Sequence, residues 1–268
     1  MAEGDTIIEV ENVSQRLGGA QILKGVSFVV RDRVRPGTVT GQIVGLLGPS
    51  GVGKTRLLRI IAGLDAPDTG KVVGPKGKPT SAGEVGVVFQ NYPLLKHRTV
   101  LGNLIIAGVA NGLAADAAKK KAGELLERFD LGARASYYPA QLSGGQRQRV
   151  AIAQQLVLQK TIMLMDEPFS GLDPESLSNV MSLLVDVANM DELNTIIVVT
   201  HDIRAALTVS DTLYMLGRDD PKASPPGGAK IQKTYDLVTE GLAYRSDLEQ
   251  DPKFLKLEQE IRAFFATL

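Results

Sequence analysis

Residues 43–55 read IVGLLGPSGVGKT, and this stretch decides the fold. Its first five residues are apolar without alternation, which is typical of a strand covered on both faces in a parallel sheet. The next eight fit the pattern G-x-x-x-x-G-K-[ST]. Arg56–Ala62 then has helical spacing, and Gly63 is placed to end that helix. Strand, glycine-rich turn and helix in this order predict an α/β unit with an anion site at the turn.

Further runs of the same buried-strand character lie downstream of this stretch: Val85–Phe89, Ile162–Met165 and Ile196–Thr200. Helical patterns separate them, so we expect an α/β fold with a mostly parallel central sheet. Upstream, Ile7–Val13 and Val26–Val30 look like strands separated by turns. They predict a small N-terminal antiparallel β layer on the edge of the sheet.

The chain is divided by two segments that lack the buried-strand pattern. Residues 91–142 are expected to form a helical insertion that continues through the next helix to about residue 155, with an Ala- and Lys-rich helix over Asn111–Phe129. After Gly217 comes a polar loop rich in Pro and Gly, and then an amphipathic helix with apolar residues at Phe254, Leu257, Ile261, Phe264 and Leu268. We expect this helix to dock on the body; a partner-binding helix is the alternative.

Composition narrows the functional classes. Lys plus Arg is 30 and Asp plus Glu is 30, and a formal charge of 0 argues against a protein that grips nucleic-acid backbones. The absence of Cys excludes disulfides and thiolate sites. No apolar run approaches the ~18–20 residues that span a bilayer, and the first residues lack the pattern of a signal peptide. We therefore expect a soluble intracellular chain.

Polar groups follow all four buried runs, at the sheet edge where parallel sheets bind ligands. The glycine-rich turn 48–55 follows the first run, and Gln90 follows the second. Asp166 and Glu167 follow the third, and His201 follows the fourth. Because the carboxyl ends of parallel strands meet at one edge, these groups define a candidate site.

The glycine-rich turn predicts a phosphate cradle, because its backbone N–H groups can turn inward around an anion. The residues expected to bind a nucleotide here are Gly48, Pro49, Ser50, Gly51, Val52, Gly53, Lys54 and Thr55. Lys54 would reach the β- and γ-phosphates, and the Thr55 hydroxyl would ligate Mg²⁺. The alternative is a glycine-rich turn with an incidental lysine.

The polar residues after the other strands complete this chemistry. Asp166 closes a buried strand, where a carboxylate needs a cation, and Mg²⁺ supplies one directly or through water. Glu167 would orient the attacking water, and His201 would contact the γ-phosphate or hold that water. The alternatives are a carboxylate pair that caps the turn at Pro168 and a structural histidine.

Residues 142–146, LSGGQ, precede a second long helical pattern. Ser143 with Gln146 three residues later fits a capping box. Two glycines in the first turn leave backbone N–H groups open to an anion. Spacing alone supports an ordinary capped helix and a second anion-binding helix start equally.

Together these residues resemble the ATP-binding subunits of ABC transporters, motif for motif along residues 5–217. Residues 48–55 resemble the Walker A motif, Gln90 the Q-loop and LSGGQ the family signature. IMLMDE at 162–167 resembles Walker B, SGLD at 170–173 the D-loop, and His201 the switch histidine.

The resemblance implies a P-loop NTPase with ATP and Mg²⁺ as its cofactors, with an ABC-type ATPase domain at 1–217 and a loop and helical tail at 218–268. The catalytic residues would be Lys54, Glu167 and His201, and the metal ligands Thr55, Gln90 and Asp166. Two departures from the family pattern fall among the expected nucleotide contacts. Leu17 stands where a base-stacking aromatic is usual, and Arg56 where a second Ser or Thr is usual.

The resemblance also implies partners. Two family subunits meet head to tail, so the residues expected to contact the partner's ATP are Ser143, Gly144, Gly145, Gln146 and Asp173. The pair would be a homodimer or would include a related ATPase subunit. Gln90 and the helical insertion would pass motion to transmembrane permease subunits, with residues 91–101 in contact. The resemblance places the chain peripherally on the cytoplasmic face of the cytoplasmic membrane. It also implies an extracytoplasmic solute-binding protein in the same system and no nucleic-acid partner.

Within the family, a short ATPase domain resembles importer subunits. Residues 57–70 and 85–95 look most like the nitrate/sulfonate/taurine group. The alternatives are an ABC-type ATPase of DNA repair or translation, an export or lipid-transport subunit, and a small-molecule kinase that uses the P-loop.

Overall fold

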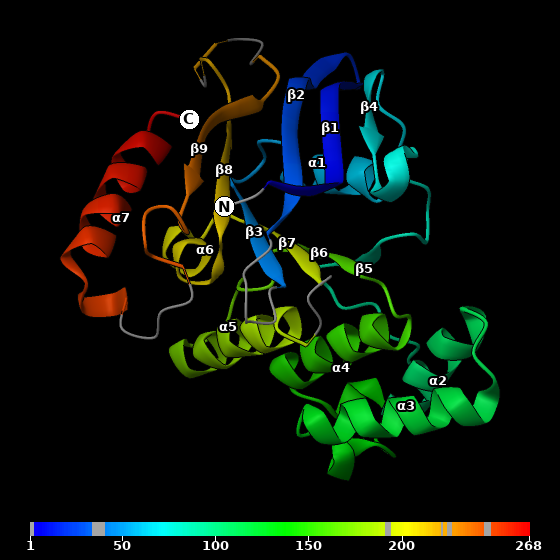
Figure 1. The fold of residues 1–268 in the computed structure, drawn as a ribbon. Helices are drawn as coiled ribbons and strands as arrows, with labels where there is room; N and C mark the ends of the chain where they lie inside the picture. The colour runs from blue at the N-terminus through cyan, green and yellow to red at the C-terminus, as the bar shows by residue number, and fades with distance from the viewer. Residues whose placement is uncertain (1–2, 34–40, 191–193, 221, 224–226, 244–247) are drawn as a thin grey trace.

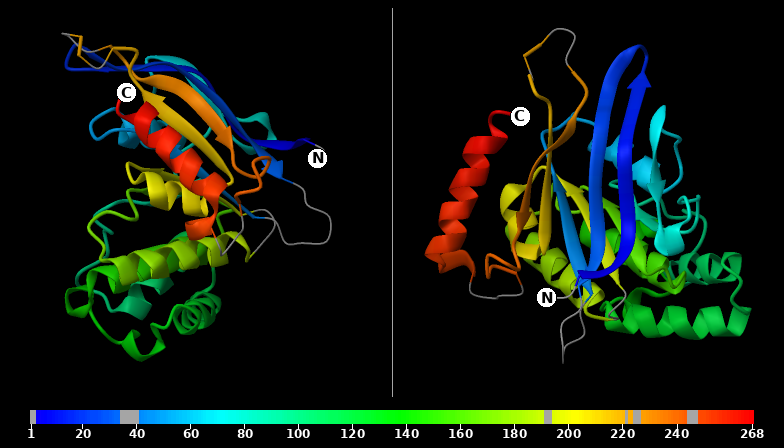
Figure 2. Two further views of the ribbon diagram at one scale, coloured as in Figure 1. Left: turned by 90° about the vertical axis from the view of Figure 1, so that its left-hand side faces the viewer. Right: turned by 45° about the horizontal axis from the view of Figure 1, so that its top comes forward.

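The computed structural model describes residues 3–33, 41–190, 194–220, 222–223, 227–243 and 248–268. Within them a central mixed sheet has a smaller antiparallel sheet on one side and a group of helices on the other (Figure 1). The turned views separate the helical group from the two sheets (Figure 2). No helix in the described part of the chain is both long and apolar enough to cross a bilayer.

The central sheet has six strands in the order β5-β6-β7-β3-β8-β9. Their bounds are β3 Gln42–Leu47, β5 Gly86–Val88, β6 Ile162–Asp166, β7 Thr195–Thr200, β8 Thr212–Gly217 and β9 Lys230–Asp236. All neighbours pair in parallel except β8 and β9, which are antiparallel. The four runs expected to be buried parallel strands are β5, β6, β7 and β3, and they stand side by side. β3, β6 and β7 are buried at every residue, because both faces of the sheet are covered.

The antiparallel sheet has the order β2-β1-β4. β1 is Glu3–Leu17, β2 is Ala20–Arg33 and β4 is Thr69–Val73. The two expected N-terminal strands lie inside β1 and β2, which confirms the antiparallel layer; β4 was not expected. Helix α1, Lys54–Ile61, packs between this sheet and the central one, so Leu57 and Ile61 share one core with residues of both sheets.

The remaining helices are α2 Val100–Ala110, α3 Ala115–Arg128, α4 Gly144–Val157, α5 Pro174–Ala188, α6 Ile203–Val209 and α7 Pro252–Phe265. Short 3₁₀ turns lie at Pro75–Gly77, Gly132–Arg134, Pro139–Gln141 and Leu248–Gln250. α2, α3 and α4 contact one another and form the expected helical insertion. The expected helix over Asn111–Phe129 is shorter in the structure: Gly112 turns the chain with φ +94°, and α3 begins only at Ala115.

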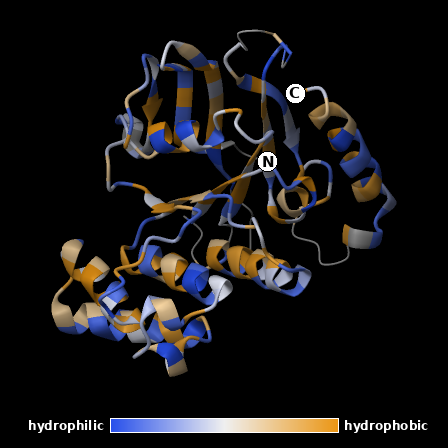
Figure 3. Cartoon of the chain, turned by 180° about the vertical axis from the view of Figure 1, so that it is seen from behind, coloured by the Kyte–Doolittle hydropathy of each residue, from blue (hydrophilic) through white to orange (hydrophobic). Residues whose placement is uncertain are grey.

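The segment after Gly217 differs from the expected loop and helix, because it also contains β9. Pairing with β8 holds β9 as an antiparallel edge strand. α7 docks on the body, as its pattern predicted: Phe254, Ile261 and Leu268 are buried, and Leu257 and Phe264 pack against the same cluster. Hydrophobic and hydrophilic residues alternate around α7 in Figure 3.

Candidate functional site

The glycine-rich turn leaves the end of β3 and leads into α1. Gly48 N–H donates to the carbonyl of Thr200 over 3.3 Å, which ties the turn to β7. Gly51 and Gly53 have φ of +75° and +113°, a region that favours glycine. Gly53 is the N-cap of α1 and makes no side-chain capping bond. The first-turn N–H groups of α1 are therefore available to an anion.

Lys54 is buried, at 6% exposure, and its ammonium has three acceptors. Nζ donates to the carbonyls of Gly48 over 2.8 Å and Pro49 over 3.0 Å. It also lies 3.2 Å from Glu167 Oε1. Because the turn's own carbonyls hold the ammonium, the positive charge is fixed beside the phosphate cradle.

Asp166, the last residue of β6, meets Thr55 at the start of α1. The Thr55 hydroxyl donates to Asp166 Oδ1 over 3.1 Å. Burial raises the pKa of Asp166, and the Thr55 hydrogen bond opposes that rise. Hard oxygen donors of this kind suit Mg²⁺, which takes one or two protein ligands and completes its shell with phosphate and water. The described residues contain no cluster of three or more acidic, His or Cys side chains that could hold a metal ion.

Glu167 follows Asp166 with φ +50°, an uncommon value for a residue with a side chain. Its N–H donates to the carbonyl of Val199 over 2.8 Å. Glu167 Oε2 accepts from the Thr200 hydroxyl over 3.2 Å and lies 2.8 Å from His201 Nδ1. The carboxylate thus lies between the ammonium of Lys54 and the imidazole of His201. The turn after β6 and the end of β7 aim both groups at one point.

A cleft of about 510 Å³ contains Lys54, Thr55, Glu167 and His201, whereas Asp166 lines an adjoining hollow that shares Gln90 with it. The lining residues of the cleft are Leu17, Ile22, Ser50, Gly51, Gly53, Lys54, Thr55, Arg56, Gln90, Glu167, Ser170 and His201. Ten of them are candidates from the sequence, and the candidates Gly48, Pro49 and Val52 lie in the turn without lining the cleft. Ile22 and Ser170 were missed: nothing in β2 marks Ile22, whereas Ser170 opens the SGLD motif.

Three lining residues show how the cleft departs from the expected pattern. Leu17 is exposed at the end of β1. The Arg56 guanidinium lies 3.3 Å from Asp65, a carboxylate that it shares with Arg59, which is closer at 2.6 Å. Gln90 Nε2 donates to the Ser170 hydroxyl over 3.5 Å. Within the described residues, Gln90 makes no hydrogen bond to Asp166.

LSGGQ lines a different hollow, of about 600 Å³. Ser143 Oγ accepts from Gln146 N–H over 3.3 Å, and Gln146 Oε1 accepts from Ser143 N–H over 3.0 Å, which confirms the capping box of α4. Asp173 lines the same hollow and caps α5, and hydrogen bonds from Ser176 lower the pKa of Asp173. This hollow and the P-loop cleft have no lining residue in common. One chain therefore does not bring the signature residues to its own P-loop.

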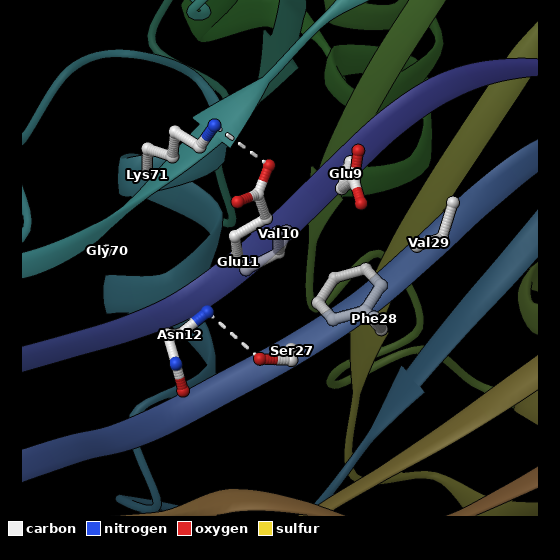
Figure 4. Close-up of a pocket in the computed structure, with 9 residues that line it drawn as sticks. All are labelled: Glu9, Val10, Glu11, Asn12, Ser27, Phe28, Val29, Gly70 and Lys71. Atoms are coloured by element: carbon white, nitrogen blue, oxygen red, sulfur yellow. Dashed lines mark hydrogen bonds and ion pairs between the residues drawn. The ribbon is translucent and has the colours of Figure 1, made fainter.

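A further hollow lies on the outer face of the antiparallel sheet and contains no candidate residue (Figure 4). Its polar groups bind one another: Lys71 pairs with Glu11 over 3.1 Å, and Asn12 N–H donates to the Ser27 hydroxyl over 2.9 Å. None of the motif residues therefore lines this hollow.

Comparison with known proteins gives one family. The model of the family described as "ABC transporter" matches residues 33–170, about half of the chain. The sulfate/thiosulfate import ATP-binding protein of Mesostigma viride is 38% identical over 78% of this chain and 58% of its own length. Its Cucumis sativus counterpart is 41% identical over 81% of this chain and 63% of its own length. The chain thus spans roughly six tenths of these relatives. A probable sulfate/thiosulfate import ATP-binding protein of Chlorella vulgaris is 38% identical over 78% of this chain and 86% of its length.

Solved structures agree with this result. A dimeric ATP-binding cassette in a post-hydrolysis state with ADP and Pi superposes with a TM-score of 0.70 at 28% identity, covering 86% of this chain and 99% of the other. A component of an ABC transporter complex from Clostridium perfringens has a TM-score of 0.74 at 24% identity, covering 96% and 99%, and supports the fold. The expected nitrate/sulfonate/taurine group gains no support from these names. Motif order, site geometry and both comparisons lead to one conclusion: the chain belongs to the ABC transporter family, in its ATP-binding branch.

Proposed function

We propose that this chain binds and hydrolyses ATP as the ATPase subunit of an ABC import system. The observation that carries the proposal is the cleft in which the P-loop, Glu167 and His201 converge, with Asp166 hydrogen-bonded to Thr55 at its edge. A phosphate-binding turn alone would serve many NTPases. In this cleft the Glu167 carboxylate also lies 2.8 Å from the His201 imidazole, beside the buried Lys54. These groups equip the cleft for attack by water on a bound phosphate.

The cleft suits Mg-ATP from one end to the other. The base end has apolar contacts from Leu17 and Ile22, without an aromatic face. The N–H groups of the P-loop and the first turn of α1 would hold the phosphates, with Lys54 against the β- and γ-phosphates. Thr55 and Asp166 would hold Mg²⁺, which supplies charge neutralisation at the phosphate oxygens.

Hydrolysis in this cleft uses Glu167. The ion pair between Lys54 Nζ and Glu167 Oε1 gives way when phosphate oxygens attract the ammonium, and this frees the carboxylate. Glu167 then takes a proton from a water whose oxygen forms the new bond to the γ-phosphorus, as the bond to the bridging β–γ oxygen breaks. Thr200 and His201 hold Oε2 and keep the carboxylate aimed. The products are ADP and inorganic phosphate.

The signature residues act on a second copy in this proposal. Ser143, Gly144, Gly145 and Gln146, with Asp173, are supported as a separate binding face because their hollow has no residue in common with the P-loop cleft. A two-fold, head-to-tail pair places each signature over the partner's ATP. The pair is a homodimer or includes a related ATPase subunit, and Asp173 caps α5 at that interface.

The cargo and membrane partners rest on the relatives. Their names favour an inorganic sulfur oxyanion, sulfate or thiosulfate, over nitrate, sulfonates or taurine. The residues between β5 and α2 are the proposed contact with transmembrane permease subunits on the cytoplasmic face of the membrane. An extracytoplasmic solute-binding protein would deliver the cargo. Sulfate or thiosulfate should raise the ATPase rate of the assembled complex, whereas equal stimulation by taurine would contradict the oxyanion assignment.

The Lys54→Ala variant tests the nucleotide site. We expect it to lose ATP binding and at least about a hundredfold in turnover, because it removes the buried cation that faces the phosphates. Steady-state phosphate release and fluorescent-nucleotide titration give the two readouts. Lys120→Ala, an exposed lysine on α3, is the matched control and should behave as wild type. Wild-type turnover by Lys54→Ala would overturn the P-loop assignment.

A further inference from the structure

The end of β8 supports the P-loop from outside the nucleotide cleft. The carbonyl of Leu216 lies so close to Gly48 that a Cβ there would collide with it. Two residues later, Arg218 Nη2 donates to the carbonyl of Gly51 over 3.2 Å. Neither Leu216 nor Arg218 lines the cleft. The last residues of β8 therefore contact the first glycine of the turn, and Arg218, which follows β8, contacts the glycine at its apex.

The Arg218 bond acts on the part of the turn with the least internal support. Val52 N–H donates to the carbonyl of Pro49 over 3.4 Å, a long bond for a turn that must keep its shape. The peptide between Gly51 and Val52 is planar, so holding the Gly51 oxygen also orients the Val52 N–H. Gly51 itself, at φ +75°, has no side chain that could restrain the backbone.

The neighbours of Arg218 hold it in this position. Gln232 of β9 donates to the Gly217 carbonyl over 3.2 Å and to Asp219 over 3.1 Å. Lys230 pairs with Asp219 over 2.8 Å. On the other side, Leu268 packs so closely on Gly217 that an added Cβ would lie 2.9 Å from the Leu268 Cβ. Among the described residues, the buried Nε of Arg218 has no hydrogen-bond partner, and Nη2 makes the bond to the P-loop.

We propose that Arg218 is a positioning residue of the nucleotide site, which fixes the P-loop apex in its phosphate-binding shape. The packing of Leu268 on Gly217 transmits the docking of α7 to this contact. The inference rests on the proposed function insofar as the bound anion is ATP. It gives the segment after β8 a role in nucleotide affinity, which no motif in that segment indicates.

The test compares the Arg218→Met, Arg218→Lys and Lys230→Met variants of the full chain. Methionine keeps the aliphatic stem and removes the donor; lysine restores a donor; Lys230→Met breaks the neighbouring pair with Asp219 and spares the P-loop bond. We expect Arg218→Met to weaken ATP binding roughly three- to tenfold, the range for one lost charge-assisted bond. Its kcat at saturating ATP should stay within about twofold, and Arg218→Lys should recover most of the affinity. A loss of folded protein would instead lower kcat and leave the Kd unchanged.

Amide hydrogen exchange at residues 51–53 of the nucleotide-free chain separates this inference from the proposed function. Faster exchange in Arg218→Met than in both wild type and Lys230→Met supports the positioning role. Failure of the wild type to bind ATP would overturn the proposed function but would leave that support in place. Unchanged exchange with unchanged ATP affinity overturns the positioning role. Equal effects from Lys230→Met also overturn the positioning role, because they would show that the pairing of β8 with β9, and not the Arg218 bond to the P-loop, sets the ATP affinity.

Discussion

At the residue scale, Asp166 shows that the site costs stability. Burial raises the pKa of Asp166 above that of an exposed aspartate. The folded chain therefore binds a proton at this group more readily than the unfolded chain does, and stability decreases as the pH rises through the ordinary Asp range near 4. At neutral pH the ionised, buried carboxylate is a net cost, which a bound cation would remove.

The Asp166→Asn variant should therefore be more stable than wild type at pH 7 without nucleotide, by about 2–4 °C in Tm for roughly 1 kcal/mol. Asparagine can still accept from Thr55, so the local bond survives. Mg²⁺-dependent turnover should be lost. Thermal melts at pH 7 and near pH 4 give the measurement, and the difference should shrink at the lower pH. Asp5→Asn, exposed on β1, is the control; a lower Tm for Asp166→Asn at pH 7 would contradict the argument.

At the element scale, α7 is held by charge as well as by its apolar face. Glu258 is 6% exposed and accepts two bonds from Arg262, at 3.0 and 2.6 Å. Arg204 of α6 lies 3.7 Å from the same carboxylate. One carboxylate therefore links α7 to α6 beneath the surface.

The Glu258→Ala variant should lose about 1–2 kcal/mol of unfolding free energy, because both arginines are partly exposed and water moderates the loss. Urea unfolding measures this change. Lys256→Ala, exposed on the same helix, should change stability by less than about 0.5 kcal/mol. An equal effect of the two variants would show that Glu258 does not fasten α7.

At the scale of the whole molecule, the P-loop cleft and the signature hollow of one chain share no lining residue, and the proposed function pairs each with the other hollow of a second copy. With Glu167→Gln, which keeps the hydrogen-bonding shape but cannot take a proton, ATP and Mg²⁺ should hold two copies together. Light scattering after size exclusion should show a dimer. Adding Ser143→Arg should return it to a monomer, because the bulky cation blocks the signature face; Ser136→Arg, on an exposed turn, should not. A persistent monomer of Glu167→Gln would contradict the shared site.

The sequence predicted those parts of the fold that carry their own signal. β3, β5, β6 and β7 were found because each is a continuous apolar run, and the candidate site residues follow the ends of those runs; β8 was missed although it is buried along its whole length. β4 and β9 were missed because most of their residues are not buried, and their pairing partners, not their composition, hold them as strands. Ile22 and Arg218 were missed for a related reason: they reach the site from segments that carry no motif.

The position of β3 also bears on how the chain is made. β3 lies between β7 and β8, and Gln42 bonds to Thr195, 153 residues later. A ribosome releases the strand that carries the P-loop long before either neighbour exists. The apolar residues that follow Gln42 in β3 must stay covered in the interval, by the early hairpin of β1 and β2, by α1 or by a chaperone. Among the described strands, β3, which leads into the P-loop, therefore waits longest in sequence for its first pairing partner.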